Sequence, residues 1–326
     1  MGADFPLILA GATGRDPATV PLLSALAATL GVGVLNVCGA HVNIPYSDPH
    51  SLGHAPTMTL PHLPDADVVL LLDPEVPWVD VAGNAPRPGA RVFLVNADPL
   101  RRTLGWFHVD ADLVCTADAA TALSQLLAAA RAASDSLAPS ILAARQTRIA
   151  AARAEHLAAV AAVERAPAPD GIAPTPAGVF GALREAARGR RALWLNEAVS
   201  AADAAWNHIA PDAPGSMCTK GGTSIGWVLG AAVGAVLGAQ VQREKAERGE
   251  KGDGAEAPEL VVALSGDGNF LFGVPTAAFW TARRYGAAFL TVVLNNGGWA
   301  VRAAFCPLEA GSNRNYHLAE PKELAR

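Results

Sequence analysis

Gly266-Asp267-Gly268-Asn269 and, further along the chain, Asn295-Asn296 are the two stretches that decide the expected fold of the second half of this sequence. Each follows a short apolar run, residues 260–264 for the first and residues 289–294 for the second, and such runs are typical of buried strands. The helix-length segment between them predicts that the two strands run parallel. Parallel strands end at the same edge of a sheet, where open α/β sheets bind their ligands. We therefore expect both polar stretches at one ligand-binding edge.

The residue types at this edge indicate a divalent cation beside a phosphate. An Asp at one strand end and an Asn at the next can hold one hard cation through oxygen atoms. Mg²⁺ prefers one or two carboxylates, neutral oxygens and substrate phosphates in an octahedral array. The glycines beside Asp267 let the backbone approach a phosphate closely. A surface turn with an unrelated Asn pair is the alternative, but it does not explain why both stretches follow apolar runs.

The same stretches resemble the cofactor motif of thiamine diphosphate-dependent enzymes, in which Gly-Asp-Gly, a spacer and a closing Asn-Asn follow one another. Here 26 residues separate Gly268 from Asn295. The resemblance implies that the side chains of Asp267 and Asn296 and the backbone carbonyl of Gly298 bind Mg²⁺. Two diphosphate oxygens and a water would complete the coordination.

The resemblance also implies contacts with the diphosphate beside the metal ligands. Gly266 and Gly268 would lie against it, and the Asn269 side chain would form a hydrogen bond with it. Glu197 follows another apolar run, residues 192–195, so its carboxylate should face the same cleft. It contacts the diphosphate or substrate on one interpretation and the positive end of a helix dipole on the other.

A second stretch, residues 221–226 (Gly-Gly-Thr-Ser-Ile-Gly), precedes a glycine-rich helix pattern. Small residues before a helix form a loop whose N–H groups can face an anion. In the enzymes that the chain resembles, such a loop carries a bulky aliphatic residue that holds the cofactor in a bent shape. The resemblance places Ile225 there and the Thr223 carbonyl against the 4′-amino group of the cofactor. Ser224 belongs to this cofactor loop, caps the following helix, or does both.

The first part of the chain alternates strand and helix patterns. Continuous apolar runs such as residues 66–73 and 91–96 indicate strands covered on both faces, and the alternation indicates a parallel sheet. Residues 140–165 form a helix pattern without strands, and the Pro-rich stretch 166–176 is typical of a linker. We therefore predict an α/β protein with two Rossmann-like parallel-sheet domains. The predicted division is a central domain at 1–134, a helix and linker at 135–175, and a truncated thiamine diphosphate-binding domain at 176–326.

As a whole, the chain resembles the central and diphosphate-binding domains of acetolactate synthase-like enzymes, a branch with benzoylformate decarboxylase-like and oxalyl decarboxylase-like relatives. The stretches 266–275 and 294–299 carry this part of the resemblance. It implies a transferase or lyase that decarboxylates 2-keto acids and joins the product to a second carbonyl. It also implies a homo-oligomer or a partner chain, since the glutamate that activates the cofactor belongs to a pyrimidine-binding domain that we expect outside this sequence. We expect no catalytic residue in the chain itself, and a non-catalytic fragment or remnant of such an enzyme is the alternative.

The composition argues against several other classes of function. The net charge is −5, with 25 basic and 30 acidic residues, so we expect no nucleic-acid partner. The four cysteines lie far apart and lack zinc-ligand spacing, which predicts reduced thiols. No signal peptide is visible, so we place the protein in the cytoplasm by default. The apolar stretch 224–241, with glycines at every fourth position, predicts a helix packed tightly against its sheet rather than a membrane span.

Two features of the first part are candidates for further sites. Gly11-Ala12-Thr13-Gly14 follows an apolar run and precedes a helix pattern, but it is only a fragment of a dinucleotide fingerprint, so we do not expect bound NAD or FAD. His41, His50, His54 and His62 lie in a Pro- and Asp-rich stretch. We expect them to be solvated loop histidines rather than metal ligands.

Overall fold

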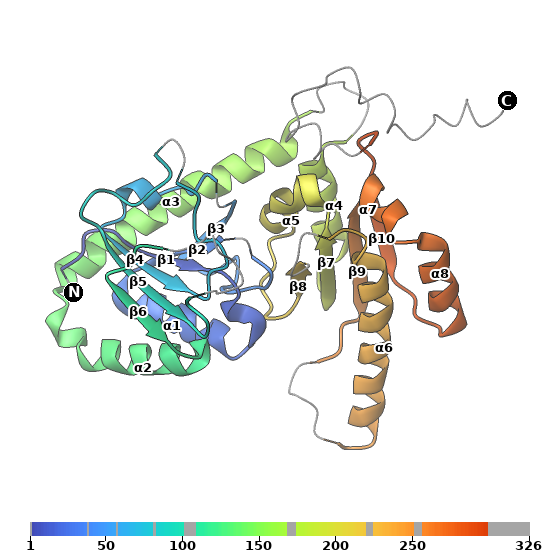
Figure 1. Ribbon diagram of the computed structural model, residues 1–326, viewed down its shortest axis with the longest axis horizontal. Coiled ribbons are helices and arrows are strands. Elements are labelled where there is room, and N and C mark those ends of the chain that lie inside the picture. The colour runs from blue at the N-terminus through green and yellow to red at the C-terminus, as the bar shows by residue number, and fades with distance from the viewer. Residues whose placement is uncertain are drawn as a thin grey trace. The chain divides into compact units, whose positions relative to one another are not determined.

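A computed structural model describes residues 2–37, 39–56, 58–80, 83–100, 109–167, 174–219, 224–250 and 256–298 (Figure 1). Contacts within the chain divide it into two compact units. The first consists of Met1–Gly181 and Trp206–Met217, and the second of Ala182–Ala205 and Cys218–Arg326. Each unit is built around a parallel sheet, so the predicted α/β class with two Rossmann-like sheets is confirmed.

The first unit has a six-stranded parallel sheet with the strand order β3-β2-β1-β4-β5-β6. This is the order of doubly wound dinucleotide-binding folds. The strands are β1 (Pro6–Ala10), β2 (Gly33–Val37), β3 (Ser51–Ala55), β4 (Val68–Leu72), β5 (Arg91–Asn96) and β6 (Leu113–Thr116). The α-helices lying wholly in this unit are α1 (Thr19–Leu30), α2 (Ala119–Ala132) and α3 (Pro139–Arg165), and short 3₁₀ turns lie at Thr13–Arg15, Leu63–Asp65 and Ser134–Ser136.

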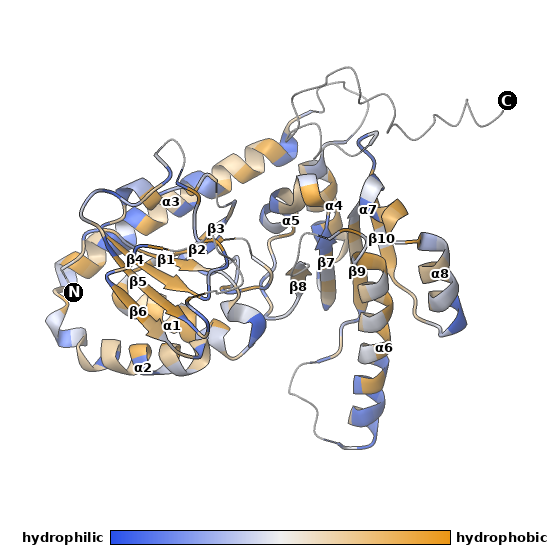
Figure 2. Ribbon diagram, viewed as in Figure 1, coloured by the Kyte–Doolittle hydropathy of each residue, from blue (hydrophilic) through white to orange (hydrophobic). Residues whose placement is uncertain are grey.

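Side chains of the sheet alternate between two hydrophobic cores, as the period of a strand requires. Leu7 and Leu9 pack in a cluster with Ile149 of α3, whereas Ile8 packs in a cluster with Leu23 of α1 and with α2. Figure 2 shows the central strands β1 and β4 as largely hydrophobic, which is the pattern of strands covered on both faces.

The long helix α3 is bound to the first unit by a buried arginine. Arg145 is only 4% exposed, and its guanidinium donates hydrogen bonds to the backbone carbonyls of Ala3 and Leu30. The helix α3 therefore packs on the first sheet, while the domain boundaries given above stay a prediction.

The second unit contains a four-stranded sheet with the order β10-β9-β7-β8. Its strands are β7 (Ala192–Glu197), β8 (Met217–Thr219), β9 (Leu260–Gly266) and β10 (Leu290–Leu294), and β7, β9 and β10 run parallel. The remaining helices of the described chain are α4 (Pro176–Ala186), α5 (Ala202–Ile209) after a 3₁₀ turn at Val199–Ala201, α6 (Val228–Glu247), α7 (Asp267–Phe272) and α8 (Pro275–Arg284). The apolar side of α6 covers β7 and β9, with Leu229, Ala232 and Val236 in the shared core.

The predicted packing of this helix on its sheet is confirmed, but the glycines of α6 do not make the contact. Gly230, Gly234 and Gly238 are exposed, and a Cβ placed on any of them would meet no atom within 4 Å. Larger aliphatic residues occupy the positions toward the sheet instead. None of the helices in the described ranges has the length and hydropathy that a membrane crossing requires.

Strand β3 was not predicted, and it corrects the assignment of one histidine. His54 lies in β3, is 7% exposed, and stacks on Trp206 with ring centroids 5.5 Å apart. Its backbone N–H donates to the side chain of Asn207. The expectation of a solvated loop residue is therefore wrong for His54, because the ring is part of the packing beneath the edge strand of the sheet.

Candidate functional site

The register of the second sheet brings the predicted metal ligands to one place. Gly266, the last residue of β9, pairs with Leu294, the last residue of β10. Asp267 then begins α7, and Asn295 and Asn296 follow β10 directly. Two parallel strands that end side by side therefore deliver a carboxylate and a carboxamide to the same edge, as the apolar runs in the sequence predicted.

Asp267, Asn296 and Gly298 converge. One terminal atom of the Asn296 side-chain amide lies 2.6 Å from the carbonyl oxygen of Gly298 and 3.3 Å from Asp267 Oδ1. With the amide nitrogen at this position, the side chain donates hydrogen bonds to both oxygens. With the amide oxygen there, three oxygens face one another, and a cation is what stabilises such a group.

The carboxylate of Asp267 has an unused oxygen. The residue is 7% exposed, and its Oδ1 accepts a hydrogen bond of 2.8 Å from the backbone N–H of Gly268. Its Oδ2 is buried and accepts no hydrogen bond from any residue that the structure describes. A buried carboxylate oxygen without a partner is costly, and coordination of a divalent cation is one of the ways in which proteins satisfy it.

The strand end before this carboxylate is not closely packed at Gly266. A Cβ placed on Gly266 would meet no described atom within 4 Å. The oxygen-rich donor set and the unused Asp267 Oδ2 fit a hard cation. Among the described residues there is no group of three or more His, Cys, Asp and Glu side chains that could hold a metal ion, so a soft or zinc-type site is not formed in that part of the chain.

Asn269 is engaged within the protein. It is 8% exposed, and its Nδ2 donates a hydrogen bond to the backbone carbonyl of Glu197 at the end of β7. The Asn269 side chain thus connects α7 to the neighbouring strand. Its contact with a diphosphate stays a prediction, as do the contacts of Gly266 and Gly268.

The sequence left two roles open for Glu197, a contact with the diphosphate or substrate and a contact with the positive end of a helix. The described contacts of its side chain are those of the second role. It is 1% exposed, and its two carboxylate oxygens accept hydrogen bonds from the backbone N–H groups of Trp227 and Val228, at 3.0 and 2.9 Å. These groups begin α6, so the helix is capped by Glu197 from another strand. The predicted cap at Ser224 is wrong, because α6 starts at Val228.

The loop before α6 is held against α7 by a glycine. Gly226 has a φ of +90°, and a Cβ on it would lie 2.9 Å from the backbone nitrogen of Gly273. Only glycine adopts this conformation in this space without strain. Ser224 and Ile225 precede it and are described, whereas Thr223 lies outside the described residues. Their contacts with a cofactor stay predictions.

The corresponding edge of the first sheet is filled by the protein itself. Asn43 is fully buried, and its Oδ1 accepts a 2.7 Å hydrogen bond from the backbone N–H of Gly14. Its Nδ2 donates to the carbonyls of Ala10 and Gly11 and to Asn36 Oδ1. The loop of the dinucleotide-like fragment therefore has its polar groups satisfied internally. No pattern in the sequence indicated this role of Asn43.

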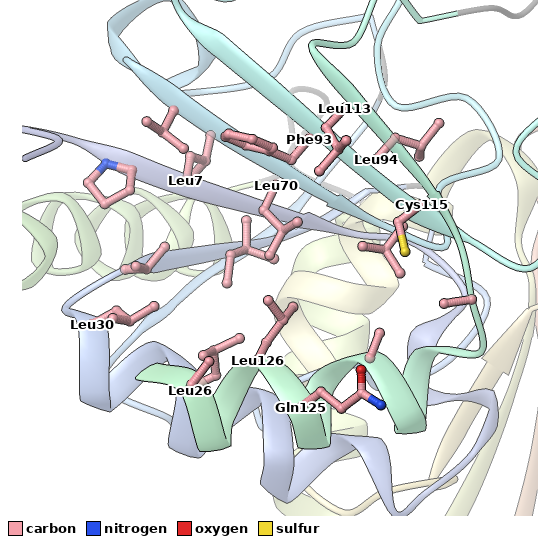
Figure 3. A pocket seen from close by; sticks show the side chains of 18 of the residues that line it. Leu7, Leu26, Leu30, Leu70, Phe93, Leu94, Leu113, Cys115, Gln125 and Leu126 are labelled. Carbon is pink, nitrogen blue, oxygen red and sulfur yellow. The ribbon is translucent and has the colours of Figure 1, made fainter. Parts of the chain in front are cut away.

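An apolar cavity of about 530 Å³ lies elsewhere in the first unit (Figure 3). It lies between the strands of the first sheet and the helices α1 and α2, and leucines such as Leu30, Leu70 and Leu126 line it. Its described lining contains no acidic or basic side chain, and its polar groups are Cys115, Thr121 and Gln125. The cavity therefore lacks the carboxylate and the Asn side chain that characterise the cluster at Asp267.

The described cysteines give no nucleophile at the candidate site. Cys115 is exposed on the edge strand of the first sheet. Burial raises the pKa of the Cys218 thiol to about 11, so this residue of β8 stays protonated near neutral pH.

Comparison with known proteins gives one family and a set of solved structures. Residues 199–322 match the family described as thiamine pyrophosphate enzyme, C-terminal TPP binding domain. A thiamine diphosphate-dependent 4-hydroxybenzoylformate decarboxylase from Rhodococcus jostii RHA1 is 21% identical, with a TM-score of 0.66. The match covers 97% of this chain and 53% of the decarboxylase chain, and the coverages below are given in the same order. A benzoylformate decarboxylase from Polynucleobacter necessarius is 18% identical, with a TM-score of 0.71, covering 99% and 55%. A putative thiamin diphosphate-dependent enzyme from Mycobacterium smegmatis is 22% identical, with a TM-score of 0.63, covering 91% and 51%.

The fold and the cluster define an α/β protein with a group of oxygen donors at the carboxyl ends of its second sheet. Residues 199–322 match the C-terminal binding domain of thiamine pyrophosphate enzymes, so this part of the chain is similar to that family. The solved structures share its fold, and the chain spans about half of their length. The acetolactate synthase-like branch stays a prediction.

Proposed function

We propose that this chain binds Mg²⁺ and thiamine diphosphate and is the cofactor-anchoring part of an enzyme that decarboxylates a 2-keto acid. The observation that carries the proposal is the convergence of the Asn296 side chain and the Gly298 carbonyl at Asp267 Oδ1, on a carboxylate whose other oxygen, Oδ2, is buried and has no partner among the described residues. The match of residues 199–322 to a thiamine pyrophosphate-binding domain supports the identity of the cofactor.

The residues of the chain would hold the metal and orient the diphosphate. Asp267 contributes the negative charge, and Asn296 and Gly298 contribute neutral oxygens, which together suit Mg²⁺ with phosphate oxygens as its remaining ligands. When bound, thiamine diphosphate supplies the electron sink for decarboxylation. The diphosphate would lie against the strand end at Gly266, where a Cβ would meet no described atom within 4 Å.

Decarboxylation of a 2-keto acid is the step common to the acetolactate synthase-like and decarboxylase-like enzymes that the sequence resembles. Two of the solved structures of the same fold are named as decarboxylases of benzoylformate type. The proposal includes a carboxylate that activates the cofactor, supplied by a pyrimidine-binding domain outside this 326-residue sequence. A partner chain, or a second copy of a longer protein, would carry that domain.

Calorimetric titration of thiamine diphosphate into the full chain, with and without Mg²⁺, tests the proposal. We expect binding that requires the metal. Asp267→Asn should weaken it about 100-fold or more, since loss of even an indirect partner of a metal ligand costs about 10–100-fold in affinity. Glu259→Gln is the matched control, because this carboxylate lies just before the amino end of the same strand and forms an ion pair with Arg191.

Two results would contradict the proposal. The first is an unmodified chain that does not bind thiamine diphosphate at all. The second is binding that is equally tight with and without divalent cations, since the cluster at Asp267 would then have no part in it.

A further inference from the structure

Glu197 is attached to two elements at once. Its side chain accepts hydrogen bonds from the first two N–H groups of α6, and its backbone carbonyl accepts one from Asn269 in α7. In the sheet, Glu197 pairs with Ser265, which lies two residues before Asp267. A single residue at the end of β7 therefore touches both the helix that follows the predicted cofactor loop and the helix that begins with the predicted metal ligand.

The contacts around α7 form a closed ring. Glu197 holds the start of α6, and Gly226, just before that helix, packs on Gly273 at the far end of α7. The backbone N–H of Gly273 in turn donates to the carbonyl of Asn269, whose side chain returns to Glu197. Because the ring encloses the short helix that starts at Asp267, a shift at any of these contacts moves the carboxylate.

The chemistry of the contact requires a carboxylate. Two backbone N–H groups at a helix N-terminus point at two separate oxygens, and both hydrogen bonds are charge-assisted. A glutamine of the same shape would offer one oxygen and place its NH₂ group against the second N–H donor. The 1% exposure of Glu197 leaves no room for water to replace the lost acceptor.

We propose that Glu197 is a positioning residue for the cofactor site, which holds the start of α6 and the helix α7 in the arrangement that presents Asp267 to the metal. This inference rests on the function proposed above. In this role Glu197 acts through Trp227 and Val228 on one side and through Asn269 on the other.

The test compares the affinity of the full chain for thiamine diphosphate in saturating Mg²⁺ for Glu197→Gln, Glu197→Asp and the unmodified protein. We expect a loss of about 10–100-fold for Glu197→Gln, the range for partners that orient metal ligands. Glu197→Asp keeps the charge on a shorter side chain and should lie between the two. Asp118→Asn is the control, because Asp118 caps α2 in the first unit through the Thr121 N–H and its loss weakens a helix without touching the ring.

Hydrogen exchange distinguishes a positioning role from a local helix cap. Loss of a local cap would change exchange at the start of α6 only, and not in α7. In Glu197→Gln, the amides of Trp227 and Val228 should exchange faster, and so should the amide of Gly268, which donates to Asp267 in α7. An unchanged Gly268 amide together with unchanged affinity overturns the inference. If circular dichroism shows that Glu197→Gln does not fold, Glu197→Asp carries the test, and unmodified affinity in that variant overturns it.

The two proposals fail in different ways. An unmodified chain without affinity for thiamine diphosphate overturns the proposed function, and this inference with it. Metal-dependent binding by the unmodified chain, with the same affinity in folded Glu197→Gln, overturns the positioning role alone.

Discussion

The carboxyl edges of the two sheets are built alike and finished differently. At the edge of the first sheet, the side chain of Asn43 satisfies the N–H of Gly14 and three oxygens around it. At the edge of the second sheet, Asp267 keeps a buried oxygen without a partner among the described residues, and a Cβ placed on Gly266 would meet no described atom within 4 Å. The described polar groups around Gly14 are satisfied within the protein, whereas we propose a bound cation at the Asp267 carboxylate.

The difference shows how little the fold alone says about function. Both sheets have parallel strands whose ends could bind an anionic ligand, and both have glycines at that place. The deciding feature is whether the protein satisfies its own polar groups at the strand ends. A single buried amide satisfies the polar groups around Gly14 at one edge, whereas one carboxylate oxygen has no partner among the described residues at the other.

Among the variants that test this difference between the two edges, Asn43→Ala should change the free energy of unfolding most. The substitution leaves the N–H of Gly14 and the carbonyls of Ala10 and Gly11 buried without their partner. Each unsatisfied buried group costs about 1–3 kcal/mol, and we expect the free energy of unfolding of the first unit to fall by about 3 kcal/mol in urea denaturation.

Binding of thiamine diphosphate is the control for this variant, and it should not change, because Asn43 belongs to the other unit. A loss of stability below about 0.5 kcal/mol would contradict the view that the first edge is closed by this side chain, since even one unsatisfied buried group costs more than that.

Much of this arrangement could be predicted from the sequence, because it depends on strand ends. Apolar runs that stop at Asp267 and at Asn295 place both polar stretches at one edge of a parallel sheet, whatever the details of packing. The alternation of strands and helices was predictable for the same reason. The strand β3, Ser51–Ala55, was not, since its Ser, Gly and His residues lack the apolar pattern of the other strands.

The contacts between distant elements could not be predicted. Glu197 meets the N–H of Val228 across 31 positions of the chain, and a Glu after a strand has no local signal for such a partner. The glycine spacing in α6 shows that Gly230, Gly234 and Gly238 share one face of the helix. It does not show which face, and the larger apolar residues of the same helix compete better for the core.

A smaller effect, of opposite sign, is expected from Asp267→Asn in the absence of metal. This substitution removes a buried negative charge whose Oδ2 has no described partner, so the metal-free chain should become more stable by about 1 kcal/mol. The same substitution should weaken metal-dependent binding, which is the trade-off expected of a functional site. Urea denaturation in chelator measures the gain, and a variant less stable than the unmodified chain in chelator would show that the Asp267 side chain is satisfied without a cation.

The smallest effect concerns the pH dependence of the first unit. Burial lowers the pKa of His156 below its ordinary value of 6.5, and the charges of Arg153, His62 and His208 lower it further. The ring is packed against β3 and lies 2.8 Å from the Tyr46 hydroxyl. Below about pH 6.5 the unfolded chain binds a proton at this residue that the folded chain resists, so the stability present above that pH is lost as the pH falls.

His156→Gln should therefore reduce the loss of stability between about pH 8 and pH 5.5 by up to about 1 kcal/mol, since glutamine can keep a hydrogen bond to Tyr46 and does not titrate. Each variant is compared with itself at the two pH values, which cancels the change in packing. The second unit serves as the reference, because metal-dependent cofactor binding should not change on His156→Gln. If the unmodified chain and His156→Gln lost the same stability over this range, the acid sensitivity of the first unit would lie in other groups, such as His41 and His62, whose pKa values burial also lowers.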